Sequence, residues 1–377
     1  MDKSNLDIDG AGTIAYEKIS EKYNSFYEPS YRIFSDGEDV EEFGIFTVTS
    51  VTVDNSILKA GSCVITAVPD PGLMKKSVAD EIFMPESCVE VYLGYNDDCE
   101  AVFIGLVKSV QFIFDAADAP EIRVMCVDLS CELMNRVSSF IWRDPKYNSF
   151  APLAKDILSE YVIGHLIEKI IVENVMTDEK PPYKQNEESD YTFLKRIADD
   201  NHIDFFTSGH NIYYRGRRRA APVTTLTWGI NIDSLVFTIK RAAAVSKVFI
   251  LGWDVKKKEK FYGEADLNGI KDRICSGRIY DYAKEAFKTG DTIWKTTSTQ
   301  DREKANMQAE NILIARNKHI LSAEGVCVGI PLILAGRVIN IEGVGELLSG
   351  EYFINGTRHT LNSSGYKTNF DIVEALG

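Results

Sequence analysis

The chain has 377 residues, of which 45% are hydrophobic and 26% charged, and its formal net charge is −14. This length accommodates two or three domains with cores of their own, and the composition excludes a disordered chain. No stretch reaches the roughly twenty apolar residues that span a membrane, and residues 1–10 lack the basic and apolar regions of a signal peptide, so synthesis in the cytoplasm without membrane insertion is expected. The acidic charge also disfavours general nucleic-acid binding.

The first third of the sequence predicts strands separated by turns. Six segments are rich in alternating apolar or β-branched residues, and clusters of Asp, Asn, Pro and Gly lie between them. Strands with this spacing favour an antiparallel barrel or sandwich. The six segments are 31–34, 44–53, 62–68, 88–95, 101–114 and 121–127.

A helix is predicted over about 150–163. Ser149 can cap it, Pro152 is tolerated in its first turn, and Gly164 can end it. Prolines in the segment 180–182 then break the backbone. The apolar face expected to be buried consists of Leu153, Ile157, Leu158, Tyr161 and Val162.

The segment 183–215 predicts a second helix followed by a hairpin. Ser189 or Asp190 can accept hydrogen bonds from the first helical turn, and the polar residues 199–201 end the helix. The period then changes to two, and Ser-Gly-His-Asn at 208–211 fits the turn of a hairpin. The two helices and the hairpin predict an α+β connector. The apolar face of the second helix consists of Phe193, Leu194, Ile197 and Ala198.

Arg217, Arg218 and Arg219 belong to the only dense basic run, directly after the hairpin. A solvated linker or an interface with a subunit or partner is favoured over a phosphate site, because no aromatic residues beyond Tyr213 and Tyr214 are interleaved with the arginines. Tight binding of nucleic acid is therefore not expected.

The last third predicts strands around one irregular region. Strands are expected at 223–228, 234–240 and 246–254, and again at 319–330, 337–342, 351–361 and 366–373. Between them, residues 256–294 are rich in glycine and mixed charge, and predict a mobile, inserted excursion. A helix with an apolar face follows a possible capping box at 298–301. That face consists of Ala305, Ala309, Ile312 and Leu313.

The sequence contains no recognisable catalytic, cofactor or metal site. The histidines lie in separate elements without an HExxH pattern, and the seven cysteines are scattered without a CxxC pair. Ser130-Cys131 has no histidine near it in the sequence, and capping explains the adjacent Glu187 and Glu188 more simply than glycoside hydrolysis does. No cofactor is therefore expected, and the chain is not expected to be an enzyme.

The start of the second helix carries a motif of six residues: Gln185, Glu188, Ser189, Asp190, Phe193 and Leu194. This motif resembles that of the phage late control protein D family, the tail hub proteins of contractile phages, and the core of VgrG spike proteins. The family pattern Gln-x-x-Glu-Ser-Asp-x-x-Phe-Leu is met, although Glu187 stands where Asn is common. Segments 88–136 and 329–370 resemble the family in the same order, so the resemblance covers about residues 85–375.

The resemblance implies a mainly β chain with two tail-tube-like antiparallel barrels, in residues 1–143 and 216–377, joined by the connector at 144–215. The excursion at about 255–318 would be inserted in the second barrel. A homotrimer would then place six barrels in a pseudo-six-fold ring around a central channel, between a six-fold tail tube and a three-fold spike.

Such a hub would leave the bacterial cytoplasm for the baseplate of a virion or a phage-tail-like particle. Its partners would be the tail tube protein, a separate spike protein and other baseplate proteins. A tail-associated peptidoglycan hydrolase and a cell-surface adhesin are the alternatives.

Overall fold

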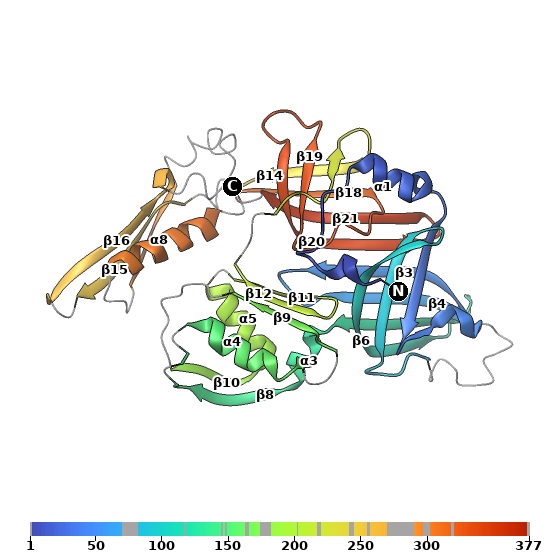
Figure 1. Ribbon diagram of the computed structural model, residues 1–377, viewed down its shortest axis with the longest axis horizontal. Coiled ribbons are helices and arrows are strands. Elements are labelled where there is room, and N and C mark those ends of the chain that lie inside the picture. The colour runs from blue at the N-terminus through green and yellow to red at the C-terminus, as the bar shows by residue number, and fades with distance from the viewer. Residues whose placement is uncertain are drawn as a thin grey trace.

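The computed structural model describes most of the chain in four parts that lie side by side: two barrels, a connector and an inserted α/β unit (Figure 1). The ranges described are 2–69, 82–116, 118–144, 146–147, 149–162, 166–173, 182–201, 203–216, 220–240, 245–254, 257–269, 290–296, 302–317 and 320–374.

The first barrel is an antiparallel sheet with the strand order β3-β4-β7-β6-β5-β1-β2. Its strands follow from the alternation in the sequence, since every second residue of β4 is buried. The predicted segments are all found as strands: β1 (Pro29–Ser35), β3 (Phe46–Ser56), β4 (Ser62–Pro69), β5 (Cys88–Tyr95), β6 (Asp98–Ile113) and β7 (Glu121–Asp128), with the short β2 (Glu38–Asp39) added.

The second barrel is built from the last third of the chain, with the order β14-β18-β21-β20 and with β19 paired to β20 and β13. The predicted strands are again found, with ends shifted by a few residues. They are β13 (Thr225–Thr227), β14 (Ile232–Ile239), β18 (Leu321–Val328), β19 (Val338–Glu342), β20 (Gly350–Asn362) and β21 (Gly365–Glu374). The prediction of a mainly β chain with antiparallel sheets is confirmed.

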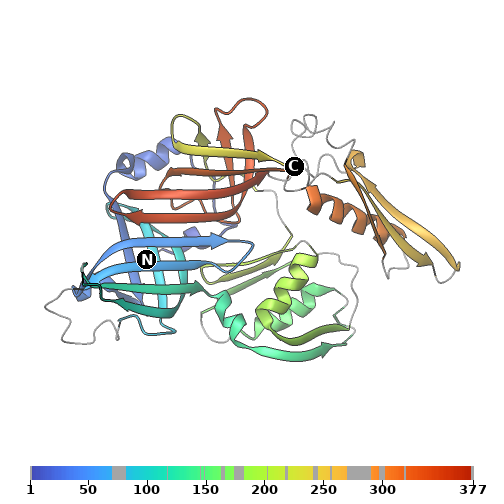
Figure 2. The ribbon, with the colours of Figure 1, turned by 180° about the vertical axis from the view of Figure 1, so that it is seen from behind.

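The two barrels are joined edge to edge. Residues 356–361 of β20 pair antiparallel with residues 51–56 of β3, which makes one continuous 13-stranded sheet. Figure 2 shows the two barrels stacked on each other at this seam. The ion pair between Arg358 and Asp54, at 2.7 Å, crosses the same seam.

The connector holds two helices between two small sheets (Figure 1). One sheet pairs β8 (Val137–Trp142) with β10 (Tyr183–Ser189), and the other has the order β11-β12-β9, with β9 (Lys169–Val172), β11 (Asp204–Ser208) and β12 (Asn211–Arg215). The helices are α4 (Phe150–Ser159) and α5 (Asp190–Asp200), and α3 (Ser130–Asn135) precedes them.

The predicted connector needs two corrections and keeps its hairpin. Residues 183–189 form a strand, β10, before the helix. Its partner β8 ends at Trp142, within the range 1–143 predicted for the first barrel, so the connector begins earlier than predicted. The helix α4 ends at Ser159, and Ser149 holds its N-cap position without a side-chain capping bond. The hairpin turn is as predicted, with Gly209 at φ 56°.

The inserted unit is a three-stranded sheet covered by a helix. Its strands are β15 (Val245–Asp254), β16 (Glu259–Asp266) and β17 (Asp291–Thr296), in the order β16-β15-β17, and α8 (Arg302–Asn317) packs on one face. The expected irregular excursion is therefore wrong for 259–266 and 291–296. The recurring glycines favour an irregular segment, but Gly263 lies within a strand. It lets α8 approach the sheet closely, since a Cβ there would lie 2.4 Å from the Ala305 carbonyl carbon.

The face predicted for α8 is buried, with Ala305, Ala309 and Leu313 fully covered. The predicted capping box at 298–301 and the rest of the excursion at 270–289 lie outside the described residues.

Candidate functional site

The motif at the start of α5 forms a mostly buried polar cluster. Ser189 is the N-cap, and its Oγ accepts from the Thr192 amide at 3.1 Å, so the structure selects Ser189 over Asp190 as the cap. Glu188 pairs with Arg196, eight residues further along the chain, at 2.6 Å. Both contacts fix where the helix begins.

The side chain of Asp190 does not cap the helix, because it points into the protein and forms buried hydrogen bonds there. It is 3% exposed and accepts hydrogen bonds from Gln185 Nε2 at 2.8 Å and from the Tyr161 hydroxyl at 2.6 Å. Burial and this hydrogen bond raise the pKa of Tyr161. Arg136 Nε lies 3.8 Å from the carboxylate. Asp190 thereby ties α5 to β10 and to Tyr161, two residues after the end of α4.

The apolar half of the motif lies in the connector core. Phe193 and Leu194 have no exposed surface and pack in one cluster with residues of both barrels and the hairpin. The motif is therefore a folding element of the connector and offers no open surface to a ligand.

A second cluster lies where the N-terminal segment, residues 2–14, passes between the barrels and the connector. Arg337, from the second barrel, is 2% exposed and donates to Asn5 Oδ1 and to the Leu332 carbonyl, both at 2.9 Å. It also donates to the main-chain carbonyls of Asn5 and Asp7. Burial lowers the pKa of Arg337 to about 10.

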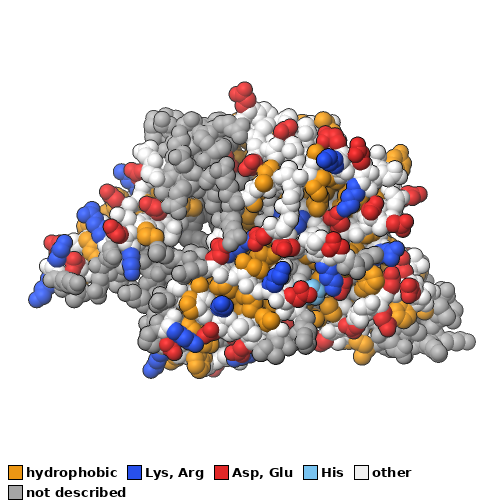
Figure 3. Space-filling model, in the orientation of Figure 1, with side chains coloured by type: hydrophobic (Ala, Val, Ile, Leu, Met, Phe, Trp, Pro, Cys, Tyr) orange, Lys and Arg blue, Asp and Glu red, His pale blue; other side chains and the backbone are white. Residues whose placement is uncertain are grey.

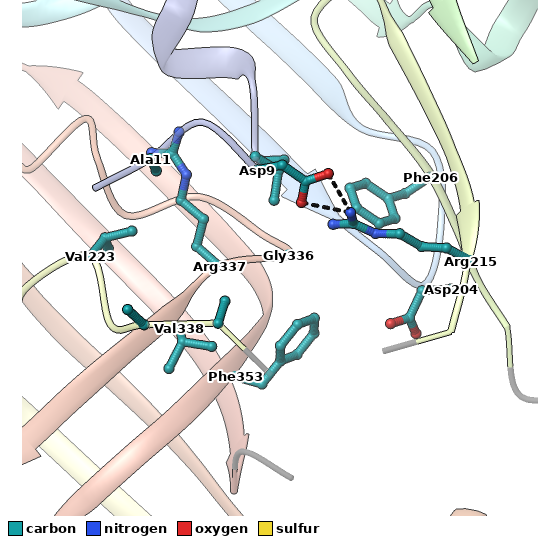
Figure 4. A pocket seen from close by; sticks show the side chains of 13 residues that line it. Asp9, Ala11, Asp204, Phe206, Arg215, Val223, Gly336, Arg337, Val338 and Phe353 are labelled. Carbon is teal, nitrogen blue, oxygen red and sulfur yellow. Dashed lines mark hydrogen bonds and ion pairs between the residues drawn. The ribbon is translucent and has the colours of Figure 1, made fainter. Parts of the chain in front are cut away.

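The same segment contacts the other two parts of the molecule. Asn5 Nδ2 donates to the Ala101 carbonyl of the first barrel at 2.8 Å. In the connector, the Tyr213 hydroxyl accepts from the Ile8 amide at 3.1 Å, and Arg215 forms an ion pair with Asp9 (Figure 4). Residues 2–14 thus link both barrels to the hairpin, beside a cavity of about 290 Å³.

Residues considered for catalysis and metal binding are not brought together. His359 is fully buried, with Nε2 2.9 Å from the Ile333 carbonyl, and burial lowers its pKa to about 4, so the ring is neutral near pH 7. Burial raises the pKa of Cys131 to about 11, which leaves the thiol protonated. Among the described residues, no group of three or more His, Cys, Asp or Glu could hold a metal ion.

Several residues singled out in the sequence lie outside the described ranges. Arg217, Arg218 and Arg219, predicted at an interface, lie outside the described residues, as do His165, His202 and His319. Within the described part, no helix is long and apolar enough to cross a membrane. Sequence reasoning missed the role of residues 2–14, because the partners that hold them lie some 100 to 330 positions away.

The fold is that of phage tail proteins. The tail protein from Neisseria meningitidis MC58 aligns with a TM-score of 0.65 at 14% identity, covering 92% of this chain and 97% of that one. The 43 kDa tail protein of prophage MuSo2 from Shewanella oneidensis aligns with a TM-score of 0.64 at 14% identity, covering 93% of this chain and 100% of that one.

The E. coli c3393 protein, described as a component of the type VI secretion system, aligns with a TM-score of 0.53 at 10% identity over 87% of this chain and 74% of that one. The sequence model of the Alg8 N-terminal domain matches residues 28–363, and the chain belongs to that family. No curated protein matches the sequence.

Proposed function

We propose that the chain is the structural baseplate hub of a contractile tail or injection system, of the late control protein D and VgrG-core type. The observation that carries the proposal is the seam between β20 and β3, which sets two barrels side by side in one continuous sheet. The fold shared with tail proteins over more than 90% of the chain supports it.

In this proposal three copies bring six barrels into a ring with pseudo-six-fold symmetry and a central channel. Closed symmetry covers strand edges that a single chain leaves open. One side of the ring would bind the six-fold tail tube, and the other would bind a separate three-fold spike, with other baseplate proteins around it. The hub would be assembled in the bacterial cytoplasm and then reside in the baseplate.

Cryo-EM of the assembled particle tests this function. We expect three copies of the chain in one layer, with their barrels lining the channel between tube and spike, because one chain supplies only two barrels. Six copies in the layer, a single copy, or a position outside the baseplate would contradict the proposal.

The proposal includes the absence of catalysis. A peptidoglycan hydrolase would clear a zymogram that contains peptidoglycan, and an adhesin would bind intact cells without tube or spike. We expect the purified full-length chain to do neither, with a phage lysozyme as the positive control in the gel. Clearing by the wild-type chain would support the hydrolase in place of the hub.

A further inference from the structure

The inserted sheet has an open face rich in aromatic side chains. The pairing register places Phe249, Leu251 and Trp253 of β15 on this face, beside Tyr262 of β16 and Trp294 of β17. Trp294 is 63% exposed, Trp253 49% and Tyr262 46%. The helix α8 covers the opposite face and lies between the sheet and the barrels, so the open face points away from them (Figures 1 and 2).

The exposed rings contact one another, and these contacts fix their orientations. The Phe249 and Trp294 rings are stacked, with centroids 4.4 Å apart and planes at 19°. Tyr262 meets Trp294 edge to face at 6.2 Å. Rigid aromatic side chains are the residues that contribute most to protein interfaces, and a cluster of this kind is seldom left in water.

Charge indicates what covers this face. Residues 245–317 contain 14 Lys and Arg against 11 Asp and Glu, a net charge of +3, although the whole chain carries −14. The rest of the chain is therefore strongly acidic and complementary to the inserted unit. The face with the rings also carries Glu264 and Asp266 beside Lys247 and Lys260, so it has no excess of positive charge, which disfavours a nucleic acid. The complementary acidic surface within reach of an outward-pointing face is that of another copy.

A matching surface exists on the connector. The strand β8 pairs with β10 on one side, and in the described part of the chain no strand pairs with its other side. Its apolar side chains are exposed on both faces, with Val137 at 63%, Phe140 at 53% and Ile141 at 40%. The connector around it is acidic, since residues 137–200 contain 12 Asp and Glu against 8 Lys and Arg. An exposed apolar edge strand needs a cover.

We propose that the aromatic face of β15, β16 and β17 in one copy packs against β8 of the next copy. The contact joins two different surfaces, so its repetition around a three-fold axis closes a ring. This inference rests on the proposed trimer and adds the surfaces that hold it.

Sedimentation velocity of the full-length chain tests the contact. We expect the wild-type chain to form trimers, and both Trp253→Ser with Trp294→Ser and Val137→Ser with Phe140→Ser to raise the dissociation constant at least about tenfold. The control Met307→Ser changes an exposed residue of α8, away from the aromatic face, and should leave the trimer intact. Circular dichroism confirms that each variant is folded.

Mixing the two double variants gives the sharper result. In a head-to-tail contact, a chain with an intact aromatic face can still bind a chain with an intact β8, so the mixture should form dimers of unlike chains and nothing larger. If the serine variants do not fold, Lys257→Glu with Lys260→Glu, which alters only exposed lysines at the hairpin end, should also weaken the trimer.

Three results would overturn the inference: trimers in either double variant, no dimer in the mixture of two folded monomeric variants, or a wild-type chain that stays monomeric at every concentration. None of these decides the proposed function, because the copy number and position in the particle are measured separately by cryo-EM.

Discussion

Phe193→Ala is expected to lower the free energy of unfolding by about 3 to 5 kcal/mol, since it leaves a cavity in the core of the connector. The ring has no exposed surface, and the Arg196 guanidinium lies 5.4 Å from its centroid. Phe193→Leu keeps most of the volume and should cost less than about 1.5 kcal/mol. Thermal and urea denaturation of the two variants, followed by circular dichroism, gives the comparison.

Adding Asp190→Ala to Phe193→Ala should destabilise the connector further. The Tyr161 hydroxyl would lose its acceptor, and Gln185 Nε2 would keep only the Glu188 carbonyl of its two acceptors, at a cost of about 1 to 3 kcal/mol. The two effects need not add, because the residues are neighbours on one helix. The defect should appear in stability and in assembly together. A double variant with wild-type melting and assembly would show that this helix face does not hold the connector.

Elements whose pattern is local could be predicted from the sequence. The alternation in β4 buries Cys63, Ile65 and Ala67, and it is visible in the residues themselves. The hairpin of β11 and β12 needs a residue at positive φ, and Gly209 supplies it. The helix α5 has its cap at Ser189 and its apolar face in regular spacing.

Elements that depend on distant partners could not be predicted. The strand β10 has a polar sequence, a bulge between Gln185 and Glu188, and Glu187 at φ 49°, so its strand character comes from pairing with β8. The seam of β20 with β3 joins segments about 300 positions apart. No spacing within either strand encodes that pairing, because each strand needs only a complementary edge.

The burial of the N-terminal segment also depends on distant partners and could not be predicted from its sequence. Residues 2–10 are mostly polar, and no structural element is predicted there, yet Asn5 is 8% exposed and Leu6 4%. Their burial depends on donors and acceptors from three other parts of the chain. Arg337 donates three hydrogen bonds to this segment, two to Asn5 and one to Asp7.

Arg337→Leu is expected to release residues 2–14 from the junction. Four carbonyl oxygens, on Asn5 (two), Asp7 and Leu332, would lose a donor, at about 1 to 3 kcal/mol for each one left unsatisfied. Within the described residues, the buried Arg337 guanidinium has no carboxylate at ion-pair distance. Because such an unpaired buried charge is itself costly, its removal offsets part of this loss. We expect a net loss of about 2 to 4 kcal/mol.

Hydrogen exchange at single amides separates this release from general unfolding. The Ile8 and Ile14 amides, which donate to the Tyr213 hydroxyl and the Val223 carbonyl, should exchange faster in Arg337→Leu, while amides in the middle of β4 and β7 stay protected. Arg358→Leu is the matched control, because its ion pair with Asp54 is half exposed and contributes at most about 1 kcal/mol. Unchanged exchange at Ile8 and Ile14 in Arg337→Leu would show that Asn5, Tyr213 and Arg215 hold the segment without the buried arginine.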